Sequence, residues 1–244
     1  MSFVFEELDA QDSPIGVISL RKRAELRLDG QIVYEVKLGD EFLMSSLFTE
    51  AEIQLSTLAL NAIKKRGQYE QLDVVVGGLG LGYTAVEALN HQQVDSLVVI
   101  DIMEAVIDWH QRGLVPLGKT LTADDRCTLF QGDFFAMSVA DNTGFYPSQP
   151  EQLAHAVLLD IDHSPSNWLA EGNSSFYSEA SMQQLAKKLY SGGVFGVWST
   201  ELPEPIFIEQ LEKVFIDVES HVVSFPNPYT GGESINTVYL AFKA

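Results

Sequence analysis

Four segments of this chain carry residue types that could hold an adenosine-like ligand and act on it. They are Gly77 to Gly82, Asp101, Asp133 with Phe134, and Asp160 to His163. A glycine-rich turn lets the backbone approach a ligand closely, and a helix that begins there points free N–H groups at it. A carboxylate about twenty residues further on can accept both hydroxyls of a ribose. A carboxylate beside an aromatic ring can receive an adenine amino group while the ring covers the base. The fourth segment would then face the reacting end of the ligand.

Each of these segments follows a short apolar run with the character of a buried β-strand. The four runs end at Val76, Ile100, Phe130 and Leu159. Apolar runs without polar alternation are typical of strands covered on both faces. Further strands are predicted at 194–198, 216–225 and 235–243, and helices at 49–65, 103–111, 175–190 and 203–214. This alternation predicts an α/β, Rossmann-like fold with a mostly parallel seven-stranded sheet and helices on both faces. Ligands bind such sheets at the carboxyl ends of the strands, so the four segments are expected to meet at one edge.

The spacing of the glycines favours one class of cofactor over another. A nicotinamide site has the pattern Gly-x-Gly-x-x-Gly/Ala. Counting from Gly78, the third small residue of that pattern is replaced by Tyr83, and glycine recurs one position earlier at Gly82. This spacing favours an adenosyl-sulfonium ligand and makes a nicotinamide oxidoreductase a distant alternative.

Residues 1–48 are predicted to form a separate β-rich subdomain, and residues 49–244 the Rossmann-like domain. Apolar and polar residues alternate at 16–20, 24–28 and 32–36, which is the period of half-buried strands. Asp29-Gly30 is a strong hairpin signal. Thr49 and Glu52 have the spacing of a capping box, in which each side chain bonds the other's backbone N–H at a helix start. A small β layer of this kind needs a surface to pack on, so a homodimer is expected.

Composition and charge narrow the possible partners. The 244 residues include 34 acidic and 15 basic ones, for a net charge of −19. The compact basic run Arg21-Lys22-Arg23 is too short for a nucleic-acid stripe, so nucleic acid is not expected as a partner. An acidic balance usually keeps a protein soluble, although it could also attract a cationic substrate such as a polyamine.

No apolar run approaches the roughly 20 residues that span a bilayer, and Met1 to Glu7 is acidic where a secretory signal would be basic. The single cysteine, Cys127, excludes an intrachain disulfide and is expected to be a core thiol. These features favour a cytoplasmic protein, and the scattered histidines give no indication of a metal site.

Several motifs together resemble the spermidine/spermine synthase family, the aminopropyltransferases, which share the fold of S-adenosylmethionine-dependent methyltransferases. The motifs are Leu28-Asp29-Gly30-Gln31, Asp40-Glu41-Phe42, Gly77 to Gly82, Val99-Ile100-Asp101, Gly132-Asp133-Phe134-Phe135, Leu158 to Pro165, Ser175-Phe176-Tyr177 and Gly192-Gly193-Val194. The resemblance implies that S-adenosylmethionine or its decarboxylated form is the donor. It also implies that the donor is bound by Gly77, Gly78, Gly80, Gly82, Asp101, Asp133 and Phe134. Asp160 falls at the family's first catalytic aspartate and is expected to orient the acceptor amine and accept its proton.

The acceptor side of the predicted site departs from the family. The aspartate that holds the donor's amine in the family's glycine motif is replaced here by Leu79 or Leu81, and the second acid of the catalytic segment is His163. His163 could act as a partner of Asp160, because imidazole titrates near neutral pH. The family's tyrosine-histidine signature is also replaced, by Leu43 to Ser46, and Pro226 to Gly232 matches its Tyr-Pro segment only loosely. Further candidates for the substrate pocket are Asp162, Tyr83 and Tyr229.

Three hypotheses about function follow. The first is a spermidine-synthase-like transferase that moves an aminopropyl or related alkyl group to a small-molecule amine. The second is an S-adenosylmethionine-dependent methyltransferase with an unidentified acceptor, and the third is a non-catalytic nucleotide-binding homologue. None of them requires a metal, a nucleic acid or a membrane.

Overall fold

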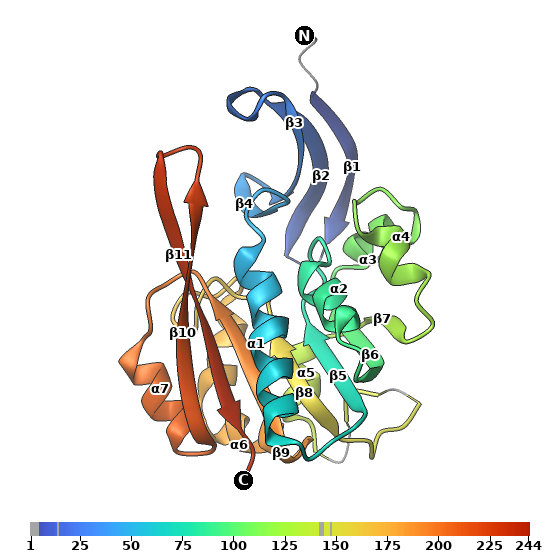
Figure 1. Ribbon diagram of the computed structural model, residues 1–244. Coiled ribbons are helices and arrows are strands. Elements are labelled where there is room, and N and C mark those ends of the chain that lie inside the picture. Colours follow the sequence, from blue (N-terminus) through green and yellow to red (C-terminus); the bar gives the residue numbers. More distant parts are fainter. Residues whose placement is uncertain (1–4, 14, 142–143, 147) are drawn as a thin grey trace.

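The computed structural model describes residues 5–13, 15–141, 144–146 and 148–244. These residues form two β-sheets, a four-stranded antiparallel sheet and a seven-stranded sheet. Figure 1 shows the small sheet at one end of the molecule, above one end of the strands of the large sheet. The large sheet therefore carries the Rossmann-like part of the chain, and the small sheet covers one end of its strands.

The large sheet has the strand order β10-β11-β9-β8-β5-β6-β7. Its members are β5 (Leu72–Gly77), β6 (Val94–Asp101), β7 (Cys127–Gln131), β8 (Ala154–Leu159), β9 (Leu189–Ser199), β10 (Ile216–Asn227) and β11 (Gly232–Phe242). Strands β5 to β9 pair in parallel, and β10 and β11 join as an antiparallel edge. The chain moves outward from β5 through β6 to β7 and then returns to the other side of β5 at β8. This reversal of strand order lies where ligands bind in open α/β sheets.

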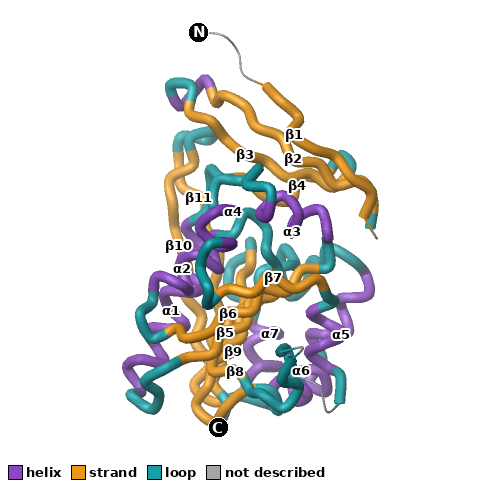
Figure 2. Tube along the Cα trace, turned by 90° about the vertical axis from the view of Figure 1, so that its right-hand side faces the viewer, coloured by secondary structure: helices purple, strands orange, loops and turns teal. Residues whose placement is uncertain are grey.

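Helices cover both faces of this sheet, as Figure 2 shows edge-on. They are α1 (Glu50–Arg66), α2 (Tyr83–Asn90), α3 (Glu104–Gln111), α4 (Gly118–Thr122), α5 (Phe134–Val139), α6 (Glu179–Ala186) and α7 (Pro205–Glu212). Alternate residues of β5 pack into different cores: Val74 and Val76 contact the layer of α1 to α4, and Val75 contacts the layer of α5 to α7. Because both faces are buried, the strand has the continuous apolar sequence from which it was predicted. The predicted fold class is confirmed.

The small sheet contains β1 (Phe5–Ser13), β2 (Gly16–Glu25), β3 (Gln31–Leu38) and β4 (Glu41–Ser45). Asp29 and Gly30 connect β2 to β3 with positive φ angles of 53° and 83°, so the predicted turn is confirmed. The prediction of a separate strand at 24–28 was wrong. β2 continues to Glu25, and Leu26–Leu28 is a 3-10 turn in which the Glu25 side chain accepts a hydrogen bond from the N–H of Arg27 at 3.0 Å. The domain division at residues 48 and 49 stays a prediction.

The predicted helix at 175–190 was also wrong in its extent. A 3-10 helix covers Glu171–Tyr177, and α6 starts afresh after Ser178, whose hydroxyl accepts a hydrogen bond from the N–H of Ser181. Strand β9 already begins at Leu189, with Gly192 inside it at a φ of +79°. Gly192 and Gly193 lie at an irregularity in the pairing of β9 with β8. Cys127 lies half-buried in β7, where burial raises the pKa of its thiol to about 12, as expected for a core cysteine.

Candidate active site

Three adjoining cavities lie between the small sheet and the carboxyl ends of the parallel strands. The Asp101 cavity, about 130 Å³, includes Gly78, Asp101, Asp133, Phe134 and Asp160 in its wall. The Asp160 cavity, about 80 Å³, includes Glu52, Tyr83, Asp160, His163 and Trp198. The Tyr229 cavity, about 640 Å³, includes Arg21, Arg23, Glu35, Glu52, Trp198 and Tyr229. The first two share Met44, Gly80 and Asp160, and the last two share Met44, Glu52 and Trp198. The strand ends therefore face a continuous series of spaces.

The glycine turn is shaped by close contacts as well as by its φ angles. Gly78, Gly80 and Gly82 have positive φ values of 96°, 50° and 91°. A side chain at Gly78 would overlap the backbone carbonyl oxygen of Asp160, and one at Gly80 would meet the sulfur of Met44 at 2.9 Å. Glycine is thus required at these positions both by conformation and by space.

Asp101 fixes the glycine turn from the end of the neighbouring strand. Its two carboxylate oxygens accept hydrogen bonds from the backbone N–H groups of Leu79, at 2.9 Å, and Met103, at 2.8 Å. Burial raises the pKa of Asp101, and these N–H donors act in the opposite direction. Because each carboxylate oxygen has a further lone pair and the residue lines the cavity, a ribose hydroxyl could still bind there.

Asp133 and Phe134 lie on the opposite wall of the Asp101 cavity, at the start of α5. Asp133 caps this helix, since its Oδ1 accepts the N–H of Ala136 at 3.0 Å. Phe134 is only 2% exposed; its ring packs against Gly77 and stacks on Phe145 at a centroid distance of 5.4 Å. The sequence predicted both residues as adenine contacts, and the structure additionally gives both a structural role.

Asp160 lies at the boundary between the Asp101 and Asp160 cavities. Its backbone N–H donates to the carbonyl of Gly77 at 2.8 Å, and its Oδ2 accepts the hydroxyl of Thr84 at 2.7 Å. Burial raises the pKa of Asp160, and the Thr84 hydrogen bond only partly opposes this. Asp160 is thus an acid predicted from the sequence that lines both the Asp101 cavity and the Asp160 cavity.

Glu52 was not predicted as a site residue, although it lines both the Asp160 and the Tyr229 cavities. The predicted capping box does not form: the Thr49 side chain makes no capping hydrogen bond within the described part of the chain, and the Glu52 carboxyl points to the cavities. Burial and the nearby charge of Asp160 raise the pKa of Glu52. The sequence did contain a signal, because Glu52 precedes the buried residues Leu55 and Ser56 by three and four positions and so shares their face of α1.

His163 and Tyr83 both line the Asp160 cavity, as the sequence predicted for residues near the reacting end. The Nε2 atom of His163 lies 3.1 Å from Oε1 of Glu41 in β4, which connects the catalytic segment to the small sheet. Tyr83 is the first residue of α2, and burial followed by the charge of Glu52 raises its pKa. The imidazole and the phenol thus lie on the walls of the same space as Asp160.

Asp162 occupies a different position from the one predicted. It is 2% exposed and is not among the described lining residues of the three cavities. Its Oδ1 accepts from the N–H of Leu169 at 2.8 Å and from Asn173 Nδ2 at 2.7 Å, and its Oδ2 accepts the hydroxyl of Tyr177 at 2.9 Å. The carboxylate therefore fastens Leu169 and the 3-10 helix Glu171–Tyr177, and its assignment as a substrate contact is corrected.

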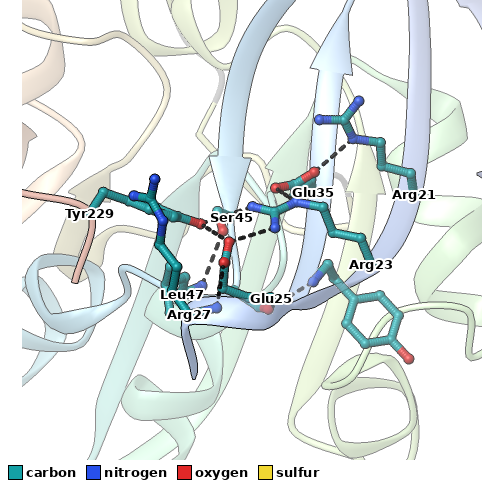
Figure 3. A network of polar contacts seen from close by, with 10 residues as sticks. Arg21, Arg23, Glu25, Arg27, Glu35, Ser45, Leu47 and Tyr229 are labelled. Atoms are coloured by element: carbon teal, nitrogen blue, oxygen red, sulfur yellow. Dashed lines mark hydrogen bonds and ion pairs between the residues drawn. The ribbon is translucent and has the colours of Figure 1, made fainter. Parts of the chain in front are cut away.

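Tyr229 lies in the turn between β10 and β11 and joins a charged network at the wall of the Tyr229 cavity (Figure 3). Its hydroxyl donates to Glu25 Oε2 and accepts from Arg23 Nη2, each at 2.8 Å. The Glu35 carboxylate, 1% exposed, accepts from both Arg21 and Arg23 at 2.7 Å. Glu25 and Glu35 are therefore already paired with guanidinium groups.

No group of three or more His, Cys, Asp or Glu side chains in the described ranges could hold a metal ion. Among the helices described, none is long and apolar enough to cross a membrane.

No family model matches the chain. Polyamine aminopropyltransferase 2 of Pseudomonas aeruginosa is 26% identical over 208 residues, which cover 83% of this chain and 52% of that protein. The chain thus spans about half the length of this curated relative.

A spermidine synthase from Thermotoga maritima has a TM-score of 0.68 at 17% identity, and the match covers 98% of this chain and 73% of that one. A spermidine synthase in complex with the transition state analogue AdoDATO also gives 0.68 at 17% identity, with coverage of 98% and 72%. A probable spermidine synthase from Corynebacterium glutamicum gives 0.63 at 12% identity, with coverage of 97% and 80%. The predicted resemblance is therefore confirmed, and the chain has the fold of the spermidine synthases.

Proposed function

We propose that this chain is a transferase that moves an aminopropyl group from decarboxylated S-adenosylmethionine to a small amine. The observation that carries the proposal is the position of Asp160. Its carboxyl lines both the Asp101 cavity and the Asp160 cavity, so it stands between a space suited to an adenosine and a space that opens outward. The similarity to an aminopropyltransferase and to spermidine synthases supports the same activity.

The donor would lie in the Asp101 cavity. Asp101 would accept the ribose hydroxyls, Asp133 the adenine amino group, and Phe134 would cover the base. The turn at Gly77, Gly78, Gly80 and Gly82 would bring the backbone close to the adenosyl group. Gly78 and Gly80 line that cavity, and a Cβ at Gly78 would overlap the backbone carbonyl of Asp160.

The reaction is an in-line displacement, in which positioning supplies most of the rate enhancement. The lone pair of the amine nitrogen forms a bond to the carbon next to the sulfonium sulfur. The bond from that carbon to sulfur breaks, and its electron pair remains on sulfur, which leaves as the neutral thioether 5′-methylthioadenosine. The nitrogen gives up a proton, for which Asp160 is the nearest candidate base, and its raised pKa suits that task near neutral pH. His163, Tyr83 and Tyr229 would line the path of the acceptor.

A second candidate, methyl transfer from intact S-adenosylmethionine, is favoured by one observation. The family's aspartate that holds the donor's amine falls at Leu79 or Leu81 here, and both leucines are only 4% exposed. Neither side chain can accept a hydrogen bond from an aminopropyl ammonium. A methyltransferase transfers no aminopropyl group, so it would not need an acid that holds the ammonium of that group.

One assay separates these functions. The protein is incubated with either sulfonium donor and a panel of diamines and monoamines, and the nucleoside product is identified by chromatography. Release of 5′-methylthioadenosine that depends on the acceptor and is lost in Asp160→Asn supports aminopropyl transfer, whereas S-adenosylhomocysteine supports methyl transfer. If neither product forms while 5′-methylthioadenosine still binds by calorimetry, the chain is a non-catalytic nucleotide-binding homologue, and the proposal fails.

The remaining expectations belong to the same proposal. A homodimer through the small sheet is supported by exposed apolar side chains there, with Phe5 53% and Val17 49% exposed, and light scattering after gel filtration would test it. A cytoplasmic location, and the absence of metal, nucleic-acid and membrane partners, also stay predictions. The first four residues, on which the argument against a secretory signal partly depends, lie outside the described ranges.

A further inference from the structure

The site lacks the acid of the family's glycine motif and the second acid of its catalytic segment, which is His163 here, but Glu52 from another element lines the same space. We propose that Glu52 of α1 is a catalytic residue that binds the acceptor nitrogen and, as a pair with Asp160, accepts its proton. This inference rests on the proposed transferase function and names the residue that performs its acceptor half.

The location of the two carboxyls supports such a pair. Glu52 lines the Asp160 cavity and the Tyr229 cavity, whereas Asp160 lines the Asp160 cavity and the Asp101 cavity. The two acids therefore bracket the middle space from its outer and inner sides. They are also tied through Thr84, whose hydroxyl lies 2.7 Å from Asp160 Oδ2 and 3.4 Å from the backbone oxygen of Glu52. An amine that enters from the Tyr229 cavity would meet Glu52 on its way to the donor.

Glu52 is also the acid that has no other partner. Among the described residues that line the Asp160 and Tyr229 cavities, the acids are Glu35, Glu52 and Asp160. Arg21 and Arg23 both donate to Glu35, and Thr84 donates to Asp160. Within the described ranges, no other residue forms a hydrogen bond or ion pair with the Glu52 carboxyl, and the one donor that lowers its pKa is its own backbone N–H. A buried carboxyl left without a partner is costly unless it is protonated or a ligand completes it.

The charge of the pair suits one ammonium group. Two neighbouring buried carboxyls cannot both ionise easily, so together they hold one proton and one negative charge near neutral pH. Burial and the charge of Asp160 raise the pKa of Glu52, and burial raises the pKa of Asp160. The other titratable groups that face Glu52 are Tyr83 and His163 across the Asp160 cavity, the Arg23–Glu35 pair across the Tyr229 cavity, and Glu50 on its own helix.

The proton balance of the step is then complete. An arriving ammonium transfers one proton to the singly protonated pair, which becomes neutral, and the nitrogen becomes a neutral nucleophile. The nitrogen forms the new bond to carbon, the carbon–sulfur bond breaks with its electron pair on sulfur, and the alkylated product leaves as an ammonium ion. The pair returns its extra proton to solvent before the next cycle.

The experiment compares Glu52→Gln with a matched control, Glu50→Gln. Glu50 is an exposed glutamate two residues earlier on the same helix, so its replacement removes the same charge without altering the cavities. For both variants, kcat and KM for the amine are measured across a pH series. The affinity for 5′-methylthioadenosine is measured by calorimetry. Glu52→Gln should raise KM for the amine at least about tenfold, the loss expected when a charge-assisted hydrogen bond is removed. It should also flatten the pH profile and leave nucleoside affinity within about twofold. Glu52→Asp should recover part of the activity.

The proposal is overturned if Glu52→Gln keeps the wild-type KM and pH profile, or if Glu50→Gln has the same effect. A separate readout remains if the wild-type protein transfers nothing. Infrared difference spectra of wild type and Glu52→Gln at neutral pH, with bound 5′-methylthioadenosine, should show a protonated carboxyl band that only the wild type has. Absence of that band refutes the shared proton, whereas its presence without any transfer refutes the proposed function and not the pair.

Discussion

Replacing Asp162 with alanine should destabilise the fold without specifically weakening acceptor binding. The Asp162 carboxylate accepts hydrogen bonds from the Leu169 N–H, the Asn173 side chain and the Tyr177 hydroxyl. A typical intramolecular hydrogen bond contributes about 0.5–1.5 kcal/mol, and a buried donor left unpaired costs somewhat more. With the Tyr177 hydroxyl buried and the other two donors half-buried, the summed loss is about 3 kcal/mol. For a chain of this size, that corresponds to a melting temperature lower by about 6–12 °C.

Asp162→Asn is the matched control for this measurement. Its amide oxygen can still accept from Leu169 and Asn173, and its NH₂ can donate to the Tyr177 oxygen, so the loss should stay near about 1 kcal/mol. Both variants are compared by thermal and urea unfolding, and KM for the amine is measured well below the melting temperature. The reasoning is refuted if Asp162→Ala melts like the wild type while its KM rises more than about tenfold, because Asp162 would then be the substrate contact that the sequence suggested.

Three further predictions concern the glycine turn and the acids around it. Gly78→Ala should abolish 5′-methylthioadenosine binding, because its side chain would overlap the Asp160 carbonyl; the control Gly231→Ala, with φ +72° but nothing within 4 Å, should bind normally in calorimetry. Asp101→Ala should weaken binding of the same nucleoside at least about tenfold, measured in the same way, since two backbone N–H groups lose their acceptor together with the ribose contact. Because the pKa of Glu52 is raised in the folded state, the wild type should lose stability relative to Glu52→Gln as the pH rises from about 4.5 to about 8 in urea titrations, and a difference that does not vary with pH would contradict this.

The fold and the donor side of the site were predictable because they depend on local sequence. The buried strand before Gly77 is continuously apolar, since helices cover both of its faces, and that pattern is read directly from the residues. Asp101 and Asp160 follow their strands immediately, so the rule for parallel sheets places them at one edge without further information. For the same reason, both were found to line the Asp101 cavity.

The errors arose where a short pattern has two structural uses. The Thr49–Glu52 spacing matches a capping box, but the helix starts without that cap, and Glu52 turns toward Asp160. Asp162 stands in a segment that resembles a catalytic motif, yet its partners Asn173 and Tyr177 come from a 3-10 helix whose position is not encoded locally. In both cases the deciding partner lies on another element, and sequence spacing alone does not identify it.

The acceptor side could not be derived from one motif because several separate elements build it. Glu52 comes from α1, Arg23 and Glu35 come from neighbouring strands of the small sheet, and Tyr229 comes from the turn after β10. The pairing of Glu35 with two guanidinium groups removes a carboxylate that could otherwise hold a second ammonium. Glu52 is then the acid still available to an amine on this wall. With one available acid, the site should bind an acceptor mainly through the charge on its attacking nitrogen. Replacing a diamine acceptor with a monoamine should therefore cost little affinity. A large loss on that change would mean that the arginine-paired acids also contact the acceptor.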